Sequence, residues 1–360
     1  MNIKIRKVLE KIEENGFEAY VIGGYVRDSL LGIETTDVDI CTNALPKDII
    51  DIFEEGVSGS YGSVTFNQGG YSFEITTYRT EGGYDKRKPT KITYVDNLIT
   101  DIKRRDFTIN AMCMSSSGEI IDVLSAKDDF QNRKIKAIGD VNIKLSEDPL
   151  RILRAIRFSI VLDFDIDEEI LKFVHYHKNL LIELSFYRKE EEINRILAST
   201  NAAKGLKLLK ELDITDALGI SYQEDIIIVK DILGVWAQIR FDEAYPFNKS
   251  SQETISAIRK IVDKGVIDNL TLFNYNLYIS TVAGEILGLK REDISKMHSE
   301  LPIKDINELA VNNKDIFKIL SLLPSAKIKI INQDIIQKVL NKELTNDYQS
   351  IKKYLIAKWT

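Results

Sequence analysis

The sequence of 360 residues is poor in the side chains that build several common kinds of catalytic centre. It has only three histidines, His175, His177 and His298, and two cysteines, Cys41 and Cys113. Two cysteines form no disulfide framework and no metal-ligand pattern, which fits the reducing cytoplasm. So few histidines argue against a phosphohydrolase domain built on His–Asp pairs and against a Ser-His-Asp triad. The phosphate-binding pattern G-x-x-x-x-G-K-[ST] is absent too.

Long apolar runs and a strong positive charge are also missing. No segment approaches the roughly 20 apolar residues of a membrane-spanning helix, so we expect no membrane partner. Residues 1–16 have apolar residues at helical spacing, which predicts a surface helix and not a signal peptide. The net charge of −6 argues against nonspecific binding to polyanions, although basic clusters occur at 85–91, 102–106 and 151–157.

The texture of the sequence changes near residue 140. Up to about residue 138, short segments rich in β-branched and aromatic residues alternate with glycines, which predicts strands, a hairpin and short helices. Beyond residue 140, helical spacing dominates. We therefore predict an α+β fold, in which a head with a small mixed sheet is followed by an all-helical remainder.

Two aspartates one residue apart, Asp37 and Asp39, are the first candidates for catalysis. On a strand, residues i and i+2 project from one face, so these carboxylates would stand side by side while Val38 packs behind them. Such oxygens suit Mg²⁺, which binds few carboxylates and completes its shell with water and substrate phosphates. Glu74, on another predicted strand, is either a third carboxylate or an ordinary exposed glutamate.

A glycine pair precedes the two aspartates. Gly23 and Gly24 end a predicted strand and open a short helix, which leaves backbone N–H groups available to a phosphate. Arg27, in the first turn of this helix, adds a forked donor. A phosphate cradle and a metal site a dozen residues apart predict a metal-bound nucleoside triphosphate.

A second block, DIKRRDFTINAM, covers residues 101–112. In it, Arg104, Arg105 and Asp106 precede an apolar stretch that contains Asn110. One interpretation is a basic turn whose Asp106 caps the next helix. In addition, an arginine held by a carboxylate is well oriented to bind a triphosphate or a sugar.

A third block, EDPLRILRAIRF, begins at Glu147. Asp148 and Pro149 are typical of a helix N-cap followed by the first helical position. The block then has arginines at three-residue spacing, Arg151, Arg154 and Arg157. They spread over a face about 120° wide, and we expect the apolar residues between and after them, including Phe158, to face the core. Arginines on such a helix are costly unless they meet anions or planar polar groups.

Asp148 and Arg151, one helical turn apart, together offer an acceptor and a forked donor. The Watson–Crick edges of cytosine and adenine each show an NH₂ donor beside a ring-nitrogen acceptor, whereas uracil and guanine show the reverse. A fixed carboxylate and guanidinium can therefore accept C or A and reject U and G, with about 1–3 kcal/mol of discrimination for each good bidentate pair. The protein would then act as the template.

GGYVRD, the Asp37/Asp39 pair, RRDFTINA and EDPLRILRAIRF, in this order and spacing, resemble class II CCA-adding tRNA nucleotidyltransferases of the polymerase-β-like superfamily. The resemblance covers residues 1 to about 200, including LSFYRKEEEINRIL, which is similar to the family's neck-helix motif. It implies Mg²⁺-dependent, template-independent addition of CCA to tRNA 3′ ends from CTP and ATP, with release of pyrophosphate. The implied parts are a head (1–138), a nucleotide-recognising neck (139–200), a body (201–290) and a tail (291–360) whose helices hold the acceptor and T arms of tRNA.

The resemblance also implies roles for single residues. Gly24 and Arg27 would contact the triphosphate, and Asp37 and Asp39 would be the catalytic residues that hold Mg²⁺. The incoming nucleotide would be bound by Arg105, Asp148, Arg151, Arg154 and Arg157, with the base read by Asp148 and Arg151. Further candidates for the site are Glu74, Asn110 and Glu147.

Several alternatives stay open. The segment 57–66 differs from the basic segment typical of bacterial poly(A) polymerases, so poly(A) addition is disfavoured. The loop 78–94 resembles a loop that enzymes adding only CC tend to lack, but it is one residue shorter, with Glu81 for Asp and Lys88 for Arg. An enzyme that adds only A or only CC with a partner is therefore an alternative. A noncatalytic RNA-binding protein or a transferase acting on a small molecule is disfavoured, and no DNA partner is expected.

Overall fold

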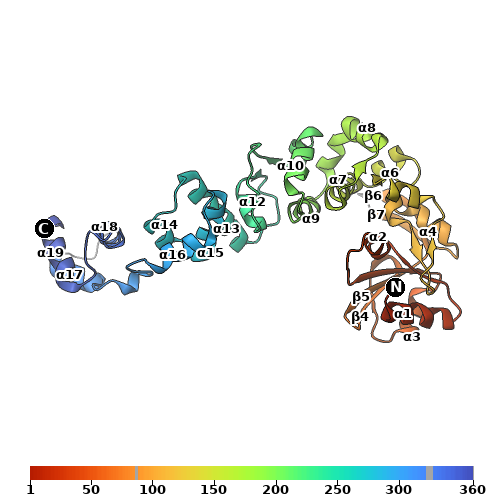
Figure 1. Ribbon diagram of the computed structural model, residues 1–360, viewed down its shortest axis with the longest axis horizontal. Coiled ribbons are helices and arrows are strands. Elements are labelled where there is room, and N and C mark those ends of the chain that lie inside the picture. The colour runs from red at the N-terminus through yellow and green to blue at the C-terminus, as the bar shows by residue number, and fades with distance from the viewer. Residues whose placement is uncertain (86–87, 322–326, 360) are drawn as a thin grey trace. The chain divides into compact units, whose positions relative to one another are not determined.

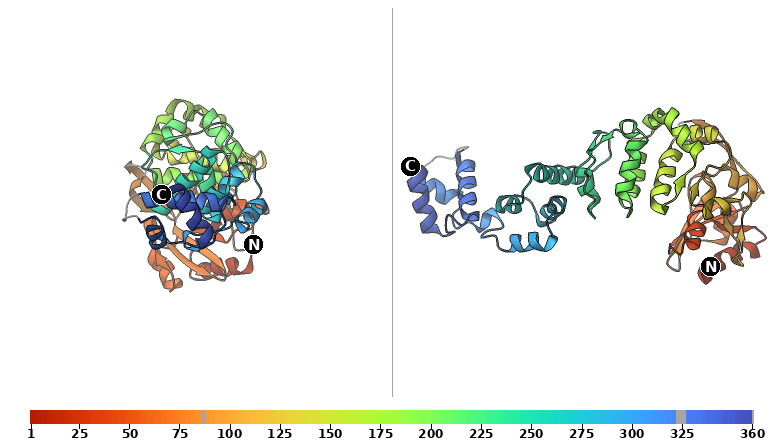
Figure 2. Two further views of the ribbon diagram at one scale, coloured as in Figure 1. Left: turned by 90° about the vertical axis from the view of Figure 1, so that its left-hand side faces the viewer. Right: turned by 45° about the horizontal axis from the view of Figure 1, so that its top comes forward.

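The computed structural model describes residues 1–85, 88–321 and 327–359 (Figures 1 and 2). The chain divides into two compact units. The first comprises Met1–Ile220 with Asp242–Tyr245, and the second comprises Ser221–Phe241 with Pro246–Thr360. The first unit contains the sheet and the residues predicted as head and neck. The finer division into head, neck, body and tail stays a prediction.

A seven-stranded sheet forms the base of the first unit, in the order β3-β4-β5-β2-β1-β8-β9. The central strand β2 is antiparallel to β1 and parallel to β5, so the predicted mixed sheet is confirmed. The strands are β1 (Ala19–Ile22), β2 (Asp37–Thr42), β3 (Val57–Ser58), β4 (Ser63–Gln68), β5 (Tyr71–Thr77), β8 (Cys113–Met114) and β9 (Ile120–Ile121). Two separate pairs are formed by β6 (Arg79–Asp85) with β7 (Lys88–Tyr94) and by β10 (Lys134–Ile135) with β11 (Asp165–Ile166).

The β6–β7 pair is the hairpin of the predicted loop 78–94. Its strands are antiparallel, and Glu81 is paired with Ile92. The side chain of Lys88, which was singled out above, lies outside the described residues. Glu81, the other departure from the family form of this loop, is described, and its side chain pairs with Arg79 at 2.8 Å.

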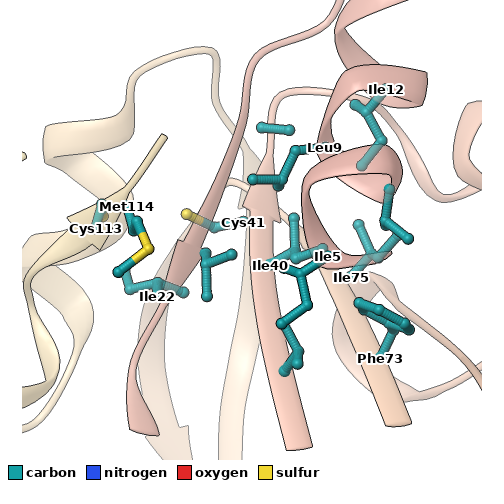
Figure 3. Close-up of a cluster of buried hydrophobic side chains, with 14 of the residues drawn as sticks. Ile5, Leu9, Ile12, Ile22, Ile40, Cys41, Phe73, Ile75, Cys113 and Met114 are labelled. Atoms are coloured by element: carbon teal, nitrogen blue, oxygen red, sulfur yellow. The ribbon is translucent and has the colours of Figure 1, made fainter. Parts of the chain in front are cut away.

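The helix α1 (Ile3–Glu14) covers one face of the sheet and fixes its hydrophobic core. Asn2 caps the helix, since its side chain accepts a hydrogen bond from the backbone N–H of Lys4. The predicted helical spacing is confirmed, because one stripe of α1 is buried against the sheet. Figure 3 shows three residues of this stripe beside the strand residues Ile40, Phe73 and Ile75. The stripe comprises Ile5, Val8, Leu9 and Ile12.

Strand β2 turns its two aspartates away from this core. Asp37 and Asp39 are exposed, while Val38 and Ile40 between and after them are 1% exposed. The predicted alternation is therefore confirmed. In register, Asp39 lies opposite Glu74 of the neighbouring strand β5.

Helices form much of the rest of the first unit (Figure 1), and α7 packs against α9 and α10 and contacts the short strands β10 and β11. They are α2 (Gly24–Leu30), α3 (Pro46–Ile52), α4 (Leu98–Arg104), the 3₁₀ turn η2 (Thr108–Asn110), α5 (Ala126–Gln131), α6 (Val141–Glu147), α7 (Leu150–Leu162), α8 (Glu168–His177), α9 (Phe186–Leu197), α10 (Ala202–Glu211) and α11 (Thr215–Leu218).

The start of α7 differs from the prediction by one position. Asp148 directly follows α6, Pro149 precedes the helix, and Leu150 is its first residue. The Asp148 carboxylate still accepts from the backbone N–H of Leu150, at 3.0 Å. It therefore satisfies a free donor at the helix start, as a cap does.

The second unit is built of helices. They are α12 (Ile232–Ala237), α13 (Lys249–Lys264), α14 (Asn269–Asn274), α15 (Leu277–Ile286), α16 (Arg291–Ser299), α17 (Asn313–Leu320), α18 (Lys327–Leu340) and α19 (Tyr348–Trp359). The short strands β11, β12 (Ile220–Ser221) and β13 (Arg240–Phe241) depart from the prediction that the chain is all-helical beyond residue 138. Over the described ranges, no helix is both long and apolar enough to cross a membrane.

Candidate active site

A cleft of about 520 Å³ in the first unit, here called the central cleft, gathers most of the predicted site residues. The side chains of Asp37 and Asp39 on β2 form the part called its floor, and the other lining residues, its walls, come mainly from the β1–α2 turn, the end of α4, the turn η2 and the helices α7 and α9. It is lined by Gly23, Gly24, Tyr25, Arg27, Asp28, Thr35, Asp37, Asp39, Glu81, Arg104, Arg105, Asp106, Asn110, Asp148, Arg151, Arg154, Arg157, Phe158 and Arg195.

The floor of the central cleft concentrates negative charge. Desolvation raises the pKa of Asp39, and the Glu74 and Asp37 carboxylates raise it further, against the opposing effect of Arg105. Gly23, with φ of 78°, begins α2 directly above this strand, and a Cβ there would lie 3.1 Å from Oδ2 of Asp39. Glycine therefore suits this position for both its backbone conformation and its lack of a side chain.

A chain of hydrogen bonds links α2 to α7 through the turn η2. Nη1 of Arg27 donates to Oδ1 of Asn110 at 2.7 Å, and Asn110 in turn donates to Asp106 at 3.3 Å. Asp106 accepts from Nε of Arg154 at 2.7 Å. Arg27 also forms an ion pair with Asp28, at 2.7 Å. Arg27 of α2 and Arg154 of α7 are thus held in fixed orientations in the lining of the cleft.

Asp106 has a different role from the predicted helix cap. The turn that follows begins after Phe107, with no side-chain cap. The Asp106 carboxylate instead accepts from the backbone N–H of Phe107 and pairs with Arg154. Burial would raise its pKa, but the charge and hydrogen bond of Arg154, helped by Phe107 and Asn110, lower the pKa to about 2. The capping expectation was wrong because a guanidinium 48 residues away offers a stronger partner.

The end of α4 places two arginines on one buried carboxylate. Asp101, whose side chain is 1% exposed, accepts from Nε of Arg104 at 2.8 Å and from Nη2 of Arg105 at 3.1 Å. Arg104 also pairs with Glu81 of the hairpin, at 3.2 Å. Nε of Arg105 is buried and has no hydrogen-bond partner among the described residues. A buried, unpaired donor beside Asp39 is suited to an anionic ligand.

The N-terminal turn of α7 is held by its own helix and by α6. Nη1 of Arg151 donates to the backbone carbonyl of Lys144 at 2.6 Å and pairs with Glu147 at 3.3 Å. The buried Lys144 ammonium donates to the carbonyls of Lys103 and Arg104, at 3.0 and 3.3 Å. Arg151 is thereby fixed at its Nη1 end, and its side chain lines the central cleft.

The last arginine of the helix, Arg157, is paired across to α9. Its Nε donates to Glu192 at 2.6 Å, and Glu192 is 4% exposed. Burial lowers the pKa of Arg157 to about 10 in spite of Glu192, and the neighbouring charges of Arg154 and Arg195 add to the lowering. Arg195 is half-exposed and lies 3.7 Å from the same carboxylate. The positive wall predicted from the sequence is therefore balanced by the protein's own carboxylates.

A second cleft of about 380 Å³, the side cleft, also reaches Asp39. It contains Glu74 and shares Asp39, Arg104 and Arg105 with the central cleft. Two spaces therefore meet at one carboxylate and two guanidiniums. This arrangement suits a reaction in which two ligands meet at a common centre.

The structure brings nearly all predicted site residues together. Gly24, Arg27, both aspartates, Arg105, Asn110, Asp148 and the three arginines of α7 line the central cleft, and Glu74 lines the side cleft. Glu147 lines neither cleft, but it pairs with Arg151.

Other residues at the site were missed by the sequence reasoning. Asp101 was detectable, because Asp101, Arg104 and Arg105 stand at i, i+3 and i+4. The pairs of Glu81 with Arg104 and of Glu192 with Arg157 are long-range and give no local signal, whereas Glu192 and Arg195 stand at i and i+3 on α9. Phe158 was assigned to the core, and it is buried, yet it also lines the central cleft.

Fold and clefts together define the class of protein, a nucleotidyltransferase with a polymerase-β-like head. Three family models match the chain. They describe the poly A polymerase head domain (residues 19–136), an RNA and SrmB-binding site of polymerase A (163–219) and tRNA nucleotidyltransferase domain 2 (240–355).

Known relatives narrow the assignment. The CCA-adding enzyme of Limosilactobacillus reuteri is 33% identical over 95% of this chain and 93% of its own length. That of Lactobacillus delbrueckii subsp. bulgaricus is 32% identical over 97% and 96%. The chain belongs to the class II CCA-adding enzymes and is a tRNA nucleotidyltransferase. Nucleotidyltransferases of this family generally use divalent metal ions.

Solved structures agree with this assignment. The Bacillus stearothermophilus CCA-adding enzyme in complex with CTP has a TM-score of 0.84 and 27% identity, over 99% of this chain and 97% of that chain. The Thermotoga maritima CCA-adding enzyme complexed with tRNA has a TM-score of 0.69 and 20% identity, over 99% and 94%, and supports the fold alone.

Proposed function

We propose that this chain adds C, C and A in turn to the 3′ end of tRNA from CTP and ATP, in the cytoplasm, with Mg²⁺ on Asp37 and Asp39. One observation carries the proposal. The paired carboxylates on β2, Asp37 and Asp39, line the same cleft as Asp148 and Arg151. Metal binding, triphosphate binding and base selection would thus occur within one space.

The residues present fit Mg²⁺. Asp37 and Asp39 offer hard oxygen ligands from one face of a strand, and their mutual repulsion is relieved by a cation. Over the described ranges, no group of three or more His, Cys, Asp and Glu side chains is arranged to hold a metal. Water and nucleotide phosphates would therefore complete the shell, as is typical of Mg²⁺. When bound, the metal would supply charge neutralisation for phosphoryl transfer.

The chain's own residues would bind and orient the nucleotide. Arg27 and Arg154 are oriented by Asn110 and Asp106, and the unpaired Nε of Arg105 would donate to a phosphate oxygen. Asp148 and Arg151 would read the base, because an acceptor beside a forked donor matches the edges of C and A. The tRNA 3′ end would approach Asp39 through the side cleft.

The second unit would hold the acceptor and T arms of tRNA. It is built of helices, and residues 301–360 carry ten Lys against six Asp and Glu, a local excess of four positive charges. A positive surface favours binding of a polyanion. Titration of a fluorescent tRNA with the full chain and with Lys-to-Ala variants of this segment tests the assignment, and unchanged affinity would refute it.

Single-nucleotide incorporation tests the function as a whole. Three tRNA transcripts, ending at the discriminator base, at −C and at −CC, receive CTP, ATP or both with Mg²⁺. We expect ordered addition of C, C and A. Growth of only the −CC transcript with ATP would instead define an A-adding enzyme, and arrest after two Cs would define a CC-adding enzyme.

A further inference from the structure

Phe158 occupies an unusual place in the central cleft. It is the one purely hydrocarbon side chain among the described residues that line this cleft. The side chain is buried, with 5% of the residue exposed. On the far side it meets the ring of Phe107 edge to face, with ring centroids 6.0 Å apart.

Three guanidiniums surround the Phe158 ring. Their central carbons lie 4.1 Å from the ring centroid for Arg157, 5.2 Å for Arg27 and 5.3 Å for Arg154. Arg27 comes from the helix beside the glycine turn, and the other two come from α7. The Phe158 ring therefore contacts guanidiniums from both α2 and α7.

Such an arrangement has a physical consequence. Three like charges around one point repel one another, and their carboxylate partners, Asp28, Asp106 and Glu192, pull in different directions. The negative face of an aromatic ring attracts each cation, and the attraction is stronger where water is excluded. A side chain of similar volume without a π-system would fill the space but would not hold the cations.

We propose that Phe158 is a positioning residue for nucleotide binding, whose ring holds Arg27, Arg154 and Arg157 at the spacing that a triphosphate requires. The proposal rests on the proposed function, in which these arginines bind the nucleotide. Phe158 itself would act through the arginines, because they surround it.

Kinetics of C addition to a tRNA transcript test this role. Phe158→Leu should raise KM for CTP about tenfold, since one to two partly desolvated cation–π contacts are worth that much, and should leave kcat within about twofold. Phe158→Tyr, which keeps the ring, should stay within about threefold of the wild-type KM. Phe158→Met provides a second apolar variant if Phe158→Leu folds poorly.

Phe107→Leu is the matched control. Phe107 is fully buried against the same ring, and no described guanidinium contacts it, so this variant loses packing without losing a cation–π contact. Its KM should stay within about twofold of wild type while its Tm falls as much as that of Phe158→Leu.

An equal rise in KM for Phe158→Leu and Phe107→Leu would overturn the proposal, as would a Phe158→Tyr variant as impaired as Phe158→Leu. The proposed function fails separately, and the proposal with it, if Arg154→Ala leaves KM for CTP unchanged in the otherwise wild-type chain.

Discussion

The arginines of α7 and the carboxylates of β2 and β5 differ in whether the protein itself supplies partners of opposite charge. On α7, every arginine already has a carboxylate or carbonyl partner, at 2.6 to 3.3 Å. On β2 and β5, by contrast, carboxylates face one another, and the pKa of Asp39 is raised. The arginines of α7 are thus held in place in the protein alone, whereas the carboxylates of the floor repel one another, and the proposed cation would relieve this repulsion. Organised cations and an unsatisfied anionic floor are what a site for a metal–triphosphate complex requires.

The largest effect should follow from removing the floor. Asp37→Ala and Asp39→Ala should lower nucleotide incorporation by at least about a thousandfold, because each removes one of the two carboxylates proposed to hold the metal in the transition state. The affinity for tRNA should stay near that of wild type. Primer extension with each variant, next to Asp51→Ala on the exposed face of α3, provides the measurement. Activity within tenfold of wild type would disprove the metal assignment.

The next largest effect should follow from removing the carboxylate that pairs with Arg154, and it concerns the free energy of unfolding. Asp106→Asn should cost about 2–3 kcal/mol of unfolding free energy, since a partly buried Arg154 would lose its charged partner. The native pKa of about 2 lies below the ordinary value of 3.8. The contribution of Asp106 is therefore complete above pH 4 and is lost as the pH falls toward 2.

Urea unfolding between pH 2 and pH 7 measures this contribution. The variant should lack the part of the acid destabilisation that wild type shows between pH 4 and pH 2. Asp163→Asn, which breaks an exposed pair with Lys204, should have little effect and serves as the control. An equal decrease in the free energy of unfolding for the two variants would mean that the Asp106–Arg154 pair stabilises the fold no more than an exposed ion pair does.

A smaller change is expected in selectivity. Arg151→Ala should reduce the preference for C and A over U and G by about tenfold to a hundredfold, the value of one bidentate pair. Competition between CTP and UTP on a −C transcript reports this ratio. Arg188→Ala removes a half-exposed arginine of α9 and should leave the ratio unchanged. An unaltered ratio for Arg151→Ala would refute base reading by this residue.

The smallest effect is the change in thermal stability that follows from removing the charge of Asp39. A raised native pKa means that the ionised form of Asp39 destabilises the fold at neutral pH, and this penalty disappears as the pH falls below the pKa. Asp39→Asn should therefore raise Tm slightly in EDTA at pH 7, although the variant is inactive. Differential scanning fluorimetry at pH 7 and pH 4 measures the difference, and a lower Tm at pH 7 would contradict the raised pKa.

Local patterns were sufficient to predict the floor and the face of α7. Asp37 and Asp39 follow from the alternation along a strand, and the arginines follow from helical spacing. The carboxylate partners of those arginines could not be predicted from the sequence. Glu192 lies 35 residues from Arg157 and Asp106 lies 48 residues from Arg154, and periodicity within an element does not say which element lies opposite.

Phe158 shows a second limit of sequence reasoning. An aromatic residue at an inward position of a helix predicts a core side chain, and Phe158 is indeed buried. Its ring contacts three guanidiniums as well as apolar groups. The local sequence pattern does not show whether a buried aromatic ring will contact cations or only apolar side chains. The head and the helical remainder were predictable, because each has a consistent periodicity over many residues.

One measurement tests most directly whether Asp148 and Arg151, the proposed base-reading residues, can select a nucleotide without the metal. Calorimetric titration of the wild-type chain with CTP and with UTP, in EDTA and then in Mg²⁺, gives the C/U preference with and without the cation. We predict that CTP is preferred in both conditions, that Mg²⁺ tightens both nucleotides by a similar factor, and that Arg151→Ala abolishes the preference. A preference that arises only with Mg²⁺ would contradict a preassembled wall and would place base selection under the control of the metal.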